Sequence, residues 1–377
     1  KRILKISSAS EWGIGLLTRN PILIDQLLPS NSQRNLAFED KCRQLQTDIR
    51  MHRDDIESKM NILRHFKNAI VFELLDRDIR GQIMVEKISD YLSGLADFIL
   101  DVVLEECWRE LNGDSKNLDK ILIVGYGKLG SRELGYLSDL DLVFLYPHSC
   151  EKELKFYINL VRLICTWLRT KTSAGYLYEV DLQLRPYGSS GLLVTSFDKY
   201  ANYIFKDAWT WEHQAITKAR PITGEENMIR EFDLMRRKLL SRHRNRETIC
   251  NEIISMRNRM IGRRGVRGNE FDLKNSQGGL VDIEFGVQAL VLLYSDKIPE
   301  LTKNLGNIKL LEIAACNRLV SWKIATDASY AYRRYRKIQH QKQLEGEKEV
   351  ISKITDWDSE THSVGLLIKS IFQNGSY

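Results

Sequence analysis

Residues 121–146 read ILIVGYGKLGSRELGYLSDLDLVFLY, and this stretch decides the fold. It predicts an apolar strand, a glycine-rich turn, a short polar helical piece and a second strand that carries Asp139 and Asp141. Side chains alternate across a strand, so the two carboxylates lie on one face, about 6–7 Å apart at Cα. Two carboxylates on one face repel each other unless a cation lies between them. The pattern therefore indicates either a divalent-metal site or a solvated strand edge.

A third strand is predicted at 177–184, within the run YLYEVDLQLRPYGSSGLL. Alternation places four polar side chains on one of its faces: Glu179, Asp181, Gln183 and Arg185. The opposite face is apolar, which predicts a sheet with a core on one side and a cleft on the other. We expect Asp181 to complete a cluster with Asp139 and Asp141, and Glu179 is the alternative third acid.

These residue types predict chemistry at phosphorus. Three carboxylates can hold two Mg²⁺ ions about 3.5–4 Å apart, and Mg²⁺ prefers carboxylate and phosphate oxygens. One ion would activate the attacking oxygen, and the other would neutralise a triphosphate such as that of ATP while pyrophosphate leaves. Asp139, Asp141 and Asp181 are thus the predicted catalytic and metal-binding residues.

The glycine turn at 125–131 is the predicted phosphate site. Glycines let backbone N–H groups approach an anion, and Ser131 is expected to open a short helix whose N–H groups and hydroxyl bind phosphate. The Walker pattern G-x-x-x-x-G-K-[ST] is absent from the turn. The glycines match G-x-G-x-x-G, but a D-x-D on the next strand does not fit a dinucleotide-binding fold. The alternative is an ordinary tight connection between a strand and a helix.

Composition excludes several classes of protein. The 377 residues carry a formal net charge of +6, which is too weak and dispersed to indicate nucleic-acid binding. No apolar run is long enough for a membrane span. The six cysteines are isolated and the seven histidines show no metal-ligand spacing, which argues against zinc. We therefore expect a cytoplasmic protein with free thiols, without nucleic-acid or membrane partners.

Hydrophobic periodicity predicts a mostly helical α+β protein with a small sheet core. Three regions are expected: an N-terminal helical region at 1–111, a small α/β core at 112–224 and a C-terminal helical bundle at 225–377. The long segments with a helical period are 34–76, 81–111, 152–171, 197–220, 225–260, 281–295, 306–343 and 347–373.

Several other residues could belong either to the functional site or to the structural framework around it. Trp209 and Trp211 have a helical spacing that favours core positions. Lys218 and Arg220 are interpreted as facing either the nucleotide or solvent. For Asp282 and Glu284 a structural role near a helix start is favoured, and Lys274 lies in the same block of sequence. The basic run at 263–267 is expected to be a loop that could touch an acidic partner or a triphosphate.

Beyond these patterns, several blocks of the chain resemble one family closely. They are SEWGIGLLTRNPILIDQLL at 10–28, GYGKLGSRELGYLSDLDLVFLY at 125–146, YEVDLQLRPYGSSGLLV at 178–194, DAWTWEHQAITKARPITG at 207–224 and FDLKNSQGGLVDIEFGVQALVLLY at 271–294. The chain is similar to the glutamine-synthetase adenylyltransferase family, within the polymerase-β-like nucleotidyltransferase superfamily. The full-length enzymes of this family carry two such units, and this chain resembles the C-terminal, adenylylating one more.

The resemblance implies that the core at 112–224 is a polymerase-β-like nucleotidyltransferase sheet core. It also implies roles for individual residues. Asp139, Asp141 and Asp181 would bind metal and carry catalysis. The residues expected to contact the nucleotide are Gly130, Ser131, Lys128 and Arg185. Three positions depart from the family pattern: Ser131 replaces a usual glycine, Gln183 a usual arginine and Leu137 a usual small residue.

The function implied by the resemblance is ATP- and Mg²⁺-dependent transfer of AMP to a tyrosine of glutamine synthetase, which regulates nitrogen assimilation. One alternative is the phosphorolytic, deadenylylating unit of the same family. The other is a non-catalytic module that binds glutamine synthetase or a PII signalling protein, which Leu137 and Gln183 motivate.

Overall fold

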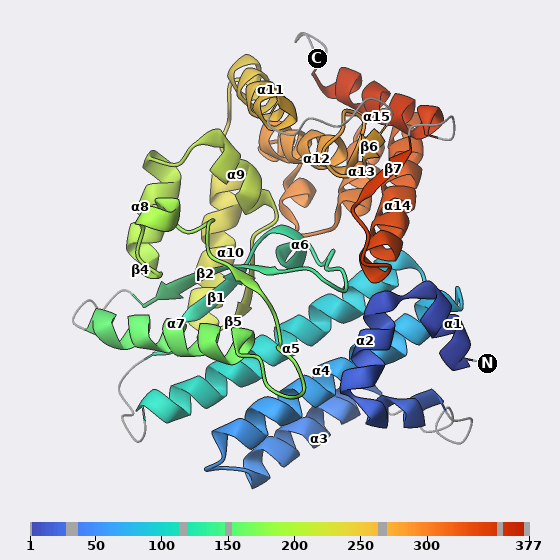
Figure 1. The fold of residues 1–377 in the computed structure, drawn as a ribbon. Helices are drawn as coiled ribbons and strands as arrows, with labels where there is room; N and C mark the ends of the chain where they lie inside the picture. Colours follow the sequence, from blue (N-terminus) through green and yellow to red (C-terminus); the bar gives the residue numbers. More distant parts are fainter. Residues whose placement is uncertain are drawn as a thin grey trace.

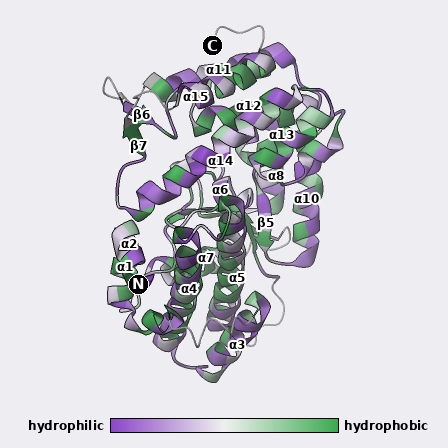
Figure 2. Ribbon diagram, turned by 90° about the vertical axis from the view of Figure 1, so that its right-hand side faces the viewer, coloured by the Kyte–Doolittle hydropathy of each residue, from purple (hydrophilic) through white to green (hydrophobic). Residues whose placement is uncertain are grey.

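The computed structural model of the chain describes residues 2–27, 37–112, 119–147, 153–262, 270–352 and 357–372. The N-terminal helices lie at one end of the molecule and helices α11–α15 at the other, with the sheet and the short helix α6 between them (Figure 1). The view turned by 90° shows the same order (Figure 2). No helix among these ranges has the length and apolarity needed to cross a membrane.

The N-terminal region is helical, as predicted. Its elements are α1 (Arg2–Ala9), α2 (Glu11–Arg19), η1 (Pro21–Leu27), α3 (Phe38–Met51), α4 (Ile56–Ile79) and α5 (Val85–Asn112). Helix α4 begins at a side-chain cap, since the Asp55 carboxylate accepts the Ser58 N–H at 2.9 Å. Within α4, the buried Arg64 donates to the carbonyls of Trp167, Thr170 and Gly175, so α4 is held against the segment that leads to the third strand.

The central part combines a small mixed sheet with helices. Its elements are β1 (Leu122–Gly125), α6 (Gly127–Gly130), β2 (Leu140–Tyr146), α7 (Leu154–Arg169), β3 (Val180–Asp181), η3 (Gly188–Ser190), β4 (Val194–Ser196), α8 (Phe197–Lys206), α9 (Thr210–Thr217) and β5 (Arg220–Thr223). The strand order is β3-β2-β1-β5, and β4 also pairs with β2. Strand β1 is antiparallel to both of its neighbours, whereas β3 and β4 run parallel to β2.

Both faces of the sheet are buried, because alternate residues enter two different cores. Ile123 and Phe144 belong to the core formed with α4, α5 and α7. Val124, Val143 and Leu145 point the other way, into a second core that runs through α8 and α10 to the C-terminal helices. Helices therefore pack against both faces of the sheet. This packing fixes the position of β2 and of the acids that it carries.

The C-terminal part is a helical bundle with one short pair of strands. Its elements are α10 (Glu226–Leu240), α11 (Arg246–Gly262), β6 (Glu270–Asp272), α12 (Leu280–Tyr294), η4 (Pro299–Thr302), α13 (Asn307–Cys316), α14 (Trp322–Leu344), β7 (Val350–Ser352) and α15 (Asp358–Ile371). Strands β6 and β7 pair antiparallel. The far end of α14 reaches the N-terminal region, where Ser10 Oγ donates to the Leu344 carbonyl at 3.1 Å.

The predicted fold class, α+β and mostly helical with a small nucleotidyltransferase-like sheet, is confirmed. Several predicted boundaries are wrong. The third strand has two residues instead of the eight predicted at 177–184, because the chain turns directly after Asp181. The helical segments 197–220, 225–260 and 306–343 are each divided into two helices, and strand β7 lies where helix was expected. Strand β5 lies mostly between two predicted helical segments, where no strand was predicted.

Candidate metal centre

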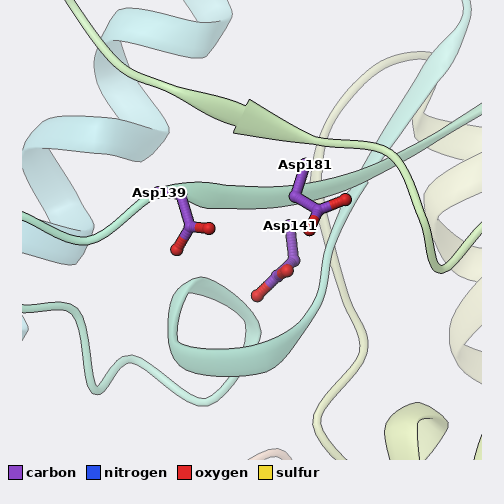
Figure 3. A group of neighbouring side chains, drawn as sticks. All are labelled: Asp139, Asp141 and Asp181. Atoms are coloured by element: carbon purple, nitrogen blue, oxygen red, sulfur yellow. The ribbon is translucent and has the colours of Figure 1, made fainter.

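Three carboxylates converge where β2 and β3 begin to pair. Asp139 precedes β2, Asp141 lies within it, and the parallel register places Asp181 opposite Asp141. One carboxylate oxygen from each lies within 4.8 Å of the others, and Figure 3 shows the three side chains gathered above the turn of α6. The cluster expected from the sequence is therefore present in the structure. Glu179, the alternative third acid, is exposed and is not part of this group.

A local hydrogen bond positions Asp181 at the end of its short strand. The Gln183 N–H donates to Asp181 Oδ1 at 2.7 Å, which fixes the carboxylate while the chain turns away. Because the donor is the backbone N–H of residue 183, this hydrogen bond forms equally well with glutamine or arginine at that position. The Gln183 side chain itself is exposed.

The glycine turn packs directly against Asp141. Gly127 has a φ of +51°, and a Cβ built on it would lie 2.1 Å from Asp141 Oδ2. A Cβ on Gly130 would lie 1.9 Å from the Lys218 carbonyl oxygen. Both positions need glycine because of close approach, and the one at 127 keeps the Asp141 carboxylate in place.

Ser131 does not open a helix, contrary to the prediction. Helix α6 begins at Gly127, and Ser131 caps its C-terminal end. The Ser131 N–H donates to the Gly127 carbonyl, and the hydroxyl lies 2.8 Å from Glu133 Oε2 and 3.0 Å from the Gly127 oxygen. The Gly130 N–H is likewise bonded, to the Tyr126 carbonyl. Phosphate binding by Gly130 and Ser131 stays a prediction.

The three acids of the site carry negative charge that the neighbouring lysines only partly offset. Burial, together with the charges of Asp139 and Asp181, raises the pKa of Asp141 from 3.8 to about 6. Lys128 and Lys274 oppose this shift. Burial and the nearby Arg336 and Lys274 charges lower the pKa of Lys128 to about 8.

The donor set fits a divalent cation. Three carboxylate oxygens within 4.8 Å of one another are hard ligands of the kind that Mg²⁺ binds. The pKa of Asp141 is raised first by burial and then by the charges of Asp139 and Asp181, and a bound cation would offset both effects. Asp139, Asp141 and Asp181 would therefore hold the divalent metal.

Comparison with known proteins gives the family. A family model described as Glutamate-ammonia ligase adenylyltransferase matches residues 1–235, more than half of the chain. The chain belongs to the glutamate-ammonia ligase adenylyltransferase family. A second model, described as GlnD PII-uridylyltransferase, matches residues 251–349, so the C-terminal bundle resembles a part of those enzymes.

Two curated relatives illustrate the extent of the similarity. The chain is 43% identical over 356 residues to a protein of Nitrosomonas europaea and 40% identical over 353 residues to one of Chromobacterium violaceum. Both are named bifunctional glutamine synthetase adenylyltransferase/adenylyl-removing enzyme. The matches cover 92% and 93% of this chain but only 38% and 39% of the relatives, so the chain spans less than two fifths of their length.

Glu133 is a buried residue of this family member that the sequence reasoning missed. Its carboxylate accepts the Asn307 N–H and side-chain amide at 2.9–3.0 Å and the Tyr332 hydroxyl at 2.8 Å. Lys218 Nζ lies 3.7 Å away. Burial would raise the pKa of Glu133, but the Lys218 and Arg336 charges and the hydrogen bonds outweigh it and lower the pKa below 4.5. Glu133 thereby ties the turn after α6 to helices α13 and α14.

Lys274, for which the sequence analysis predicted no role, acts electrostatically on the site. It stands in the loop between β6 and α12, where its N–H donates to Asp272 Oδ1 at 2.8 Å. Its side chain is exposed, and its charge acts on both Asp141 and Lys128. The signal available in the sequence was its place in the block FDLKNSQGG. The C-terminal bundle thus contributes a cation to the metal centre.

Arg185 has an internal role in the structure. Its guanidinium donates to the carbonyls of Leu182, Ser189 and Gly191 and so closes the loop after β3. A contact between Arg185 and nucleotide stays a prediction. Leu137, the other departure from the family pattern, is 43% exposed and lies outside the group of acids.

The remaining weighed residues belong to the scaffold or to the surface. Lys218 is buried and ion-paired with Glu284 at 3.3 Å, so the solvent-facing interpretation is wrong, and a contact between Lys218 and nucleotide stays a prediction. Arg220 pairs with Asp97 through two hydrogen bonds of 2.8 and 2.9 Å.

Asp282 is structural, as favoured, because it is buried in an ion pair with Arg257. Trp209 and Trp211 are 72% and 39% exposed, so the core prediction for them is wrong. The basic run at 263–267 lies outside the described residues.

Replacing Gly127 by alanine is expected to lower nucleotidyl transfer by about 10²-fold, because the new methyl group displaces the Asp141 carboxylate. The positive φ adds strain to the same position. The measurement is kcat for the variant, with circular dichroism to confirm that it is folded. Gly94→Ala is the matched control, since a Cβ at this helical position of α5 meets no atom within 4 Å. Equal rates for both variants would contradict the role of Gly127.

Proposed function

We propose that the chain transfers AMP from ATP to a tyrosine of glutamine synthetase and releases pyrophosphate. The observation that carries the proposal is the group of Asp139, Asp141 and Asp181, whose oxygens lie within 4.8 Å of one another beside the glycine turn. The name of the relatives supports glutamine synthetase as the acceptor and adenylyl as the transferred group.

In the proposed reaction the tyrosine oxygen forms a bond to the α-phosphorus, and the bond from that phosphorus to the oxygen bridging to the β-phosphate breaks. The divalent metal, when bound by the three acids, supplies neutralisation of phosphate charge and acidifies the attacking hydroxyl. Asp181 accepts the phenolic proton or helps to hold the metal that acidifies it. Lys128 and Lys274 attract the triphosphate to their side of Asp141. Gly130, Ser131 and Arg185 hold the loops that surround the nucleotide.

The test is incorporation of label from α-labelled ATP into glutamine synthetase in the presence of Mg²⁺. We expect incorporation by the wild-type chain and none by Asp139→Asn. Equal incorporation by both would contradict the metal assignment.

The direction of the reaction is tested with AMP-modified glutamine synthetase and orthophosphate. Release of ADP without any forward transfer would assign the phosphorolytic activity instead.

A non-catalytic module is the less favoured reading, because all three acids are present and converge. Calorimetry with ATP and Mg²⁺ separates the enzyme from the non-catalytic module, since a module without a working site gives no heat of binding.

A PII signalling protein is a second proposed partner, supported by the match of residues 251–349 to the PII-uridylyltransferase model. Co-purification of the chain with PII tests it.

A further inference from the structure

A pocket of about 350 Å³ opens beside the metal centre, between the N-terminal helices and the core. Its lining comes from α2, α4, the segment before β2 and the segment before β3. Asp139 belongs both to this lining and to the group of three acids. The pocket is therefore continuous with the metal centre through one shared carboxylate.

Four of the sixteen lining residues that the structure describes are aromatic: Trp12, Tyr136, Tyr176 and Tyr178. Trp12 and Tyr136 face each other with ring centroids 6.1 Å apart, and Tyr176 and Tyr178 line the pocket from the segment before β3. Leu137 is among the lining residues and is 43% exposed, while Tyr176 is 39% exposed. Exposed apolar side chains around a pocket suit a planar, apolar guest.

The charges of the pocket do not suit a phosphate. Asp139 and Glu179 contribute two carboxylates to the lining. Its two cations are already engaged: Lys67 donates to the Leu177 carbonyl and lies 4.5 Å from the Tyr178 ring centroid, and Arg19 donates to the Gly15 carbonyl at 2.9 Å. Neither Lys128 nor Lys274, the cations that act on Asp141, is among the lining residues.

The site thus has a cationic side at Lys128 and Lys274 and an aromatic side that opens at Asp139. In a displacement at phosphorus the attacking and leaving oxygens are roughly in line. If the triphosphate lies on the cationic side, the leaving pyrophosphate is there too, and the attacking hydroxyl approaches from another direction. The aromatic pocket offers a cavity for that hydroxyl, because Asp139 belongs to its lining and neither Lys128 nor Lys274 does.

We propose that this pocket receives the aromatic acceptor: a tyrosine side chain of the protein substrate, held by Trp12, Leu137 and Tyr176 with its hydroxyl at Asp139. The inference rests on the proposed function and adds the place where the acceptor binds. The N-terminal helices, which supply Trp12 and Lys67, thereby form part of the substrate site. These pocket residues position the acceptor and do not themselves react.

Kinetics on the full chain test the proposal. Leu137→Trp fills the pocket, and Tyr176→Ala removes one of its walls. We expect each to raise KM for glutamine synthetase by about tenfold while KM for ATP changes less than about twofold. Leu234→Trp is the matched control, because Leu234 is 66% exposed on α10 and does not line the pocket. A rise in KM for ATP would place the nucleotide base in the pocket and overturn the proposal, as would unchanged KM values.

A second measurement does not depend on turnover. With the photo-reactive p-benzoylphenylalanine at position 137, irradiation is expected to crosslink the chain to a tyrosine-bearing peptide of glutamine synthetase. The same group at position 234 is expected to give no such product. If the wild-type chain transfers AMP but position 137 does not crosslink, the pocket assignment is wrong and the proposed function stands. If the wild-type chain transfers no AMP in either direction, the proposed function is wrong, and the crosslink alone decides where the acceptor binds.

Discussion

Replacement of Asp141 by asparagine is expected to lower AMP transfer by at least about 10³-fold, because a neutral amide replaces the most buried of the charged metal ligands. The shape of the side chain is nearly unchanged, so contact with Gly127 is retained. The measurement is the rate of label incorporation from α-labelled ATP at saturating Mg²⁺. A loss of less than tenfold would contradict the assignment of Asp141 as a ligand.

The same substitution is expected to stabilise the metal-free protein at neutral pH. The pKa of Asp141 is raised from 3.8 to about 6 in the folded chain, so folding favours the protonated form. The stability that this proton confers is complete below about pH 4 and is lost as the pH rises through 6.

Asp141→Asn removes this pH-dependent loss and should raise the unfolding temperature at pH 7 by about 2–4 °C. The difference should disappear below about pH 4. Thermal unfolding in EDTA, compared at pH 4 and pH 7, checks the sign. Adding Mg²⁺ should then stabilise the wild type and leave the variant unchanged.

Replacement of Glu133 by alanine is expected to cost about 3–5 kcal/mol of unfolding free energy, because it leaves the buried Asn307 and Tyr332 donors without their acceptor and removes one of the two carboxylates beside the buried Lys218. Transfer activity should fall as well, since the turn after α6 loses its link to α13. Urea unfolding measures the first effect. Glu226→Ala is the control, because its ion pair with Arg230 is exposed and contributes at most about 1 kcal/mol. Equal losses for the two variants would contradict the role given to Glu133.

The pH dependence of the Glu133 contribution has the opposite sign to that of Asp141. Its pKa is lowered below 4.5 in the folded chain, so the stabilisation is present above that pH and is lost as the pH falls through the folded value. The difference in stability between wild type and Glu133→Ala should therefore shrink below about pH 4.5.

The part of the site that follows from local periodicity could be predicted from sequence. Asp139 and Asp141 are two residues apart on a strand, and their common side is a property of any extended chain. Asp181 required the further assumption that its strand pairs with β2, and the apolar runs around it supported that assumption. The turn that ends β3 was missed because it depends on one side-chain hydrogen bond, from the Gln183 N–H to Asp181.

Other features could not be predicted because they depend on residues far apart in the chain. Strand β5 contains Pro221, which normally argues against a strand, yet it lies at the edge of the sheet where proline is tolerated. Glu133 looks like a surface residue of a polar loop, and its partners Asn307 and Tyr332 lie 174 and 199 positions later. Trp209 was misplaced because it is the N-cap residue that precedes α9, with extended backbone, and so has no place on a helix face.

The two-sided burial of the sheet has a consequence for dissection of the protein. Val124, Val143 and Leu145 share one uninterrupted apolar interior with Met228, Phe232 and the helices up to α15. A fragment that stopped after β5 would present that apolar wall to water and would tend to aggregate. The three acids therefore cannot be transferred to another protein by themselves. The helices that cover the other face of their sheet would have to be transferred with them.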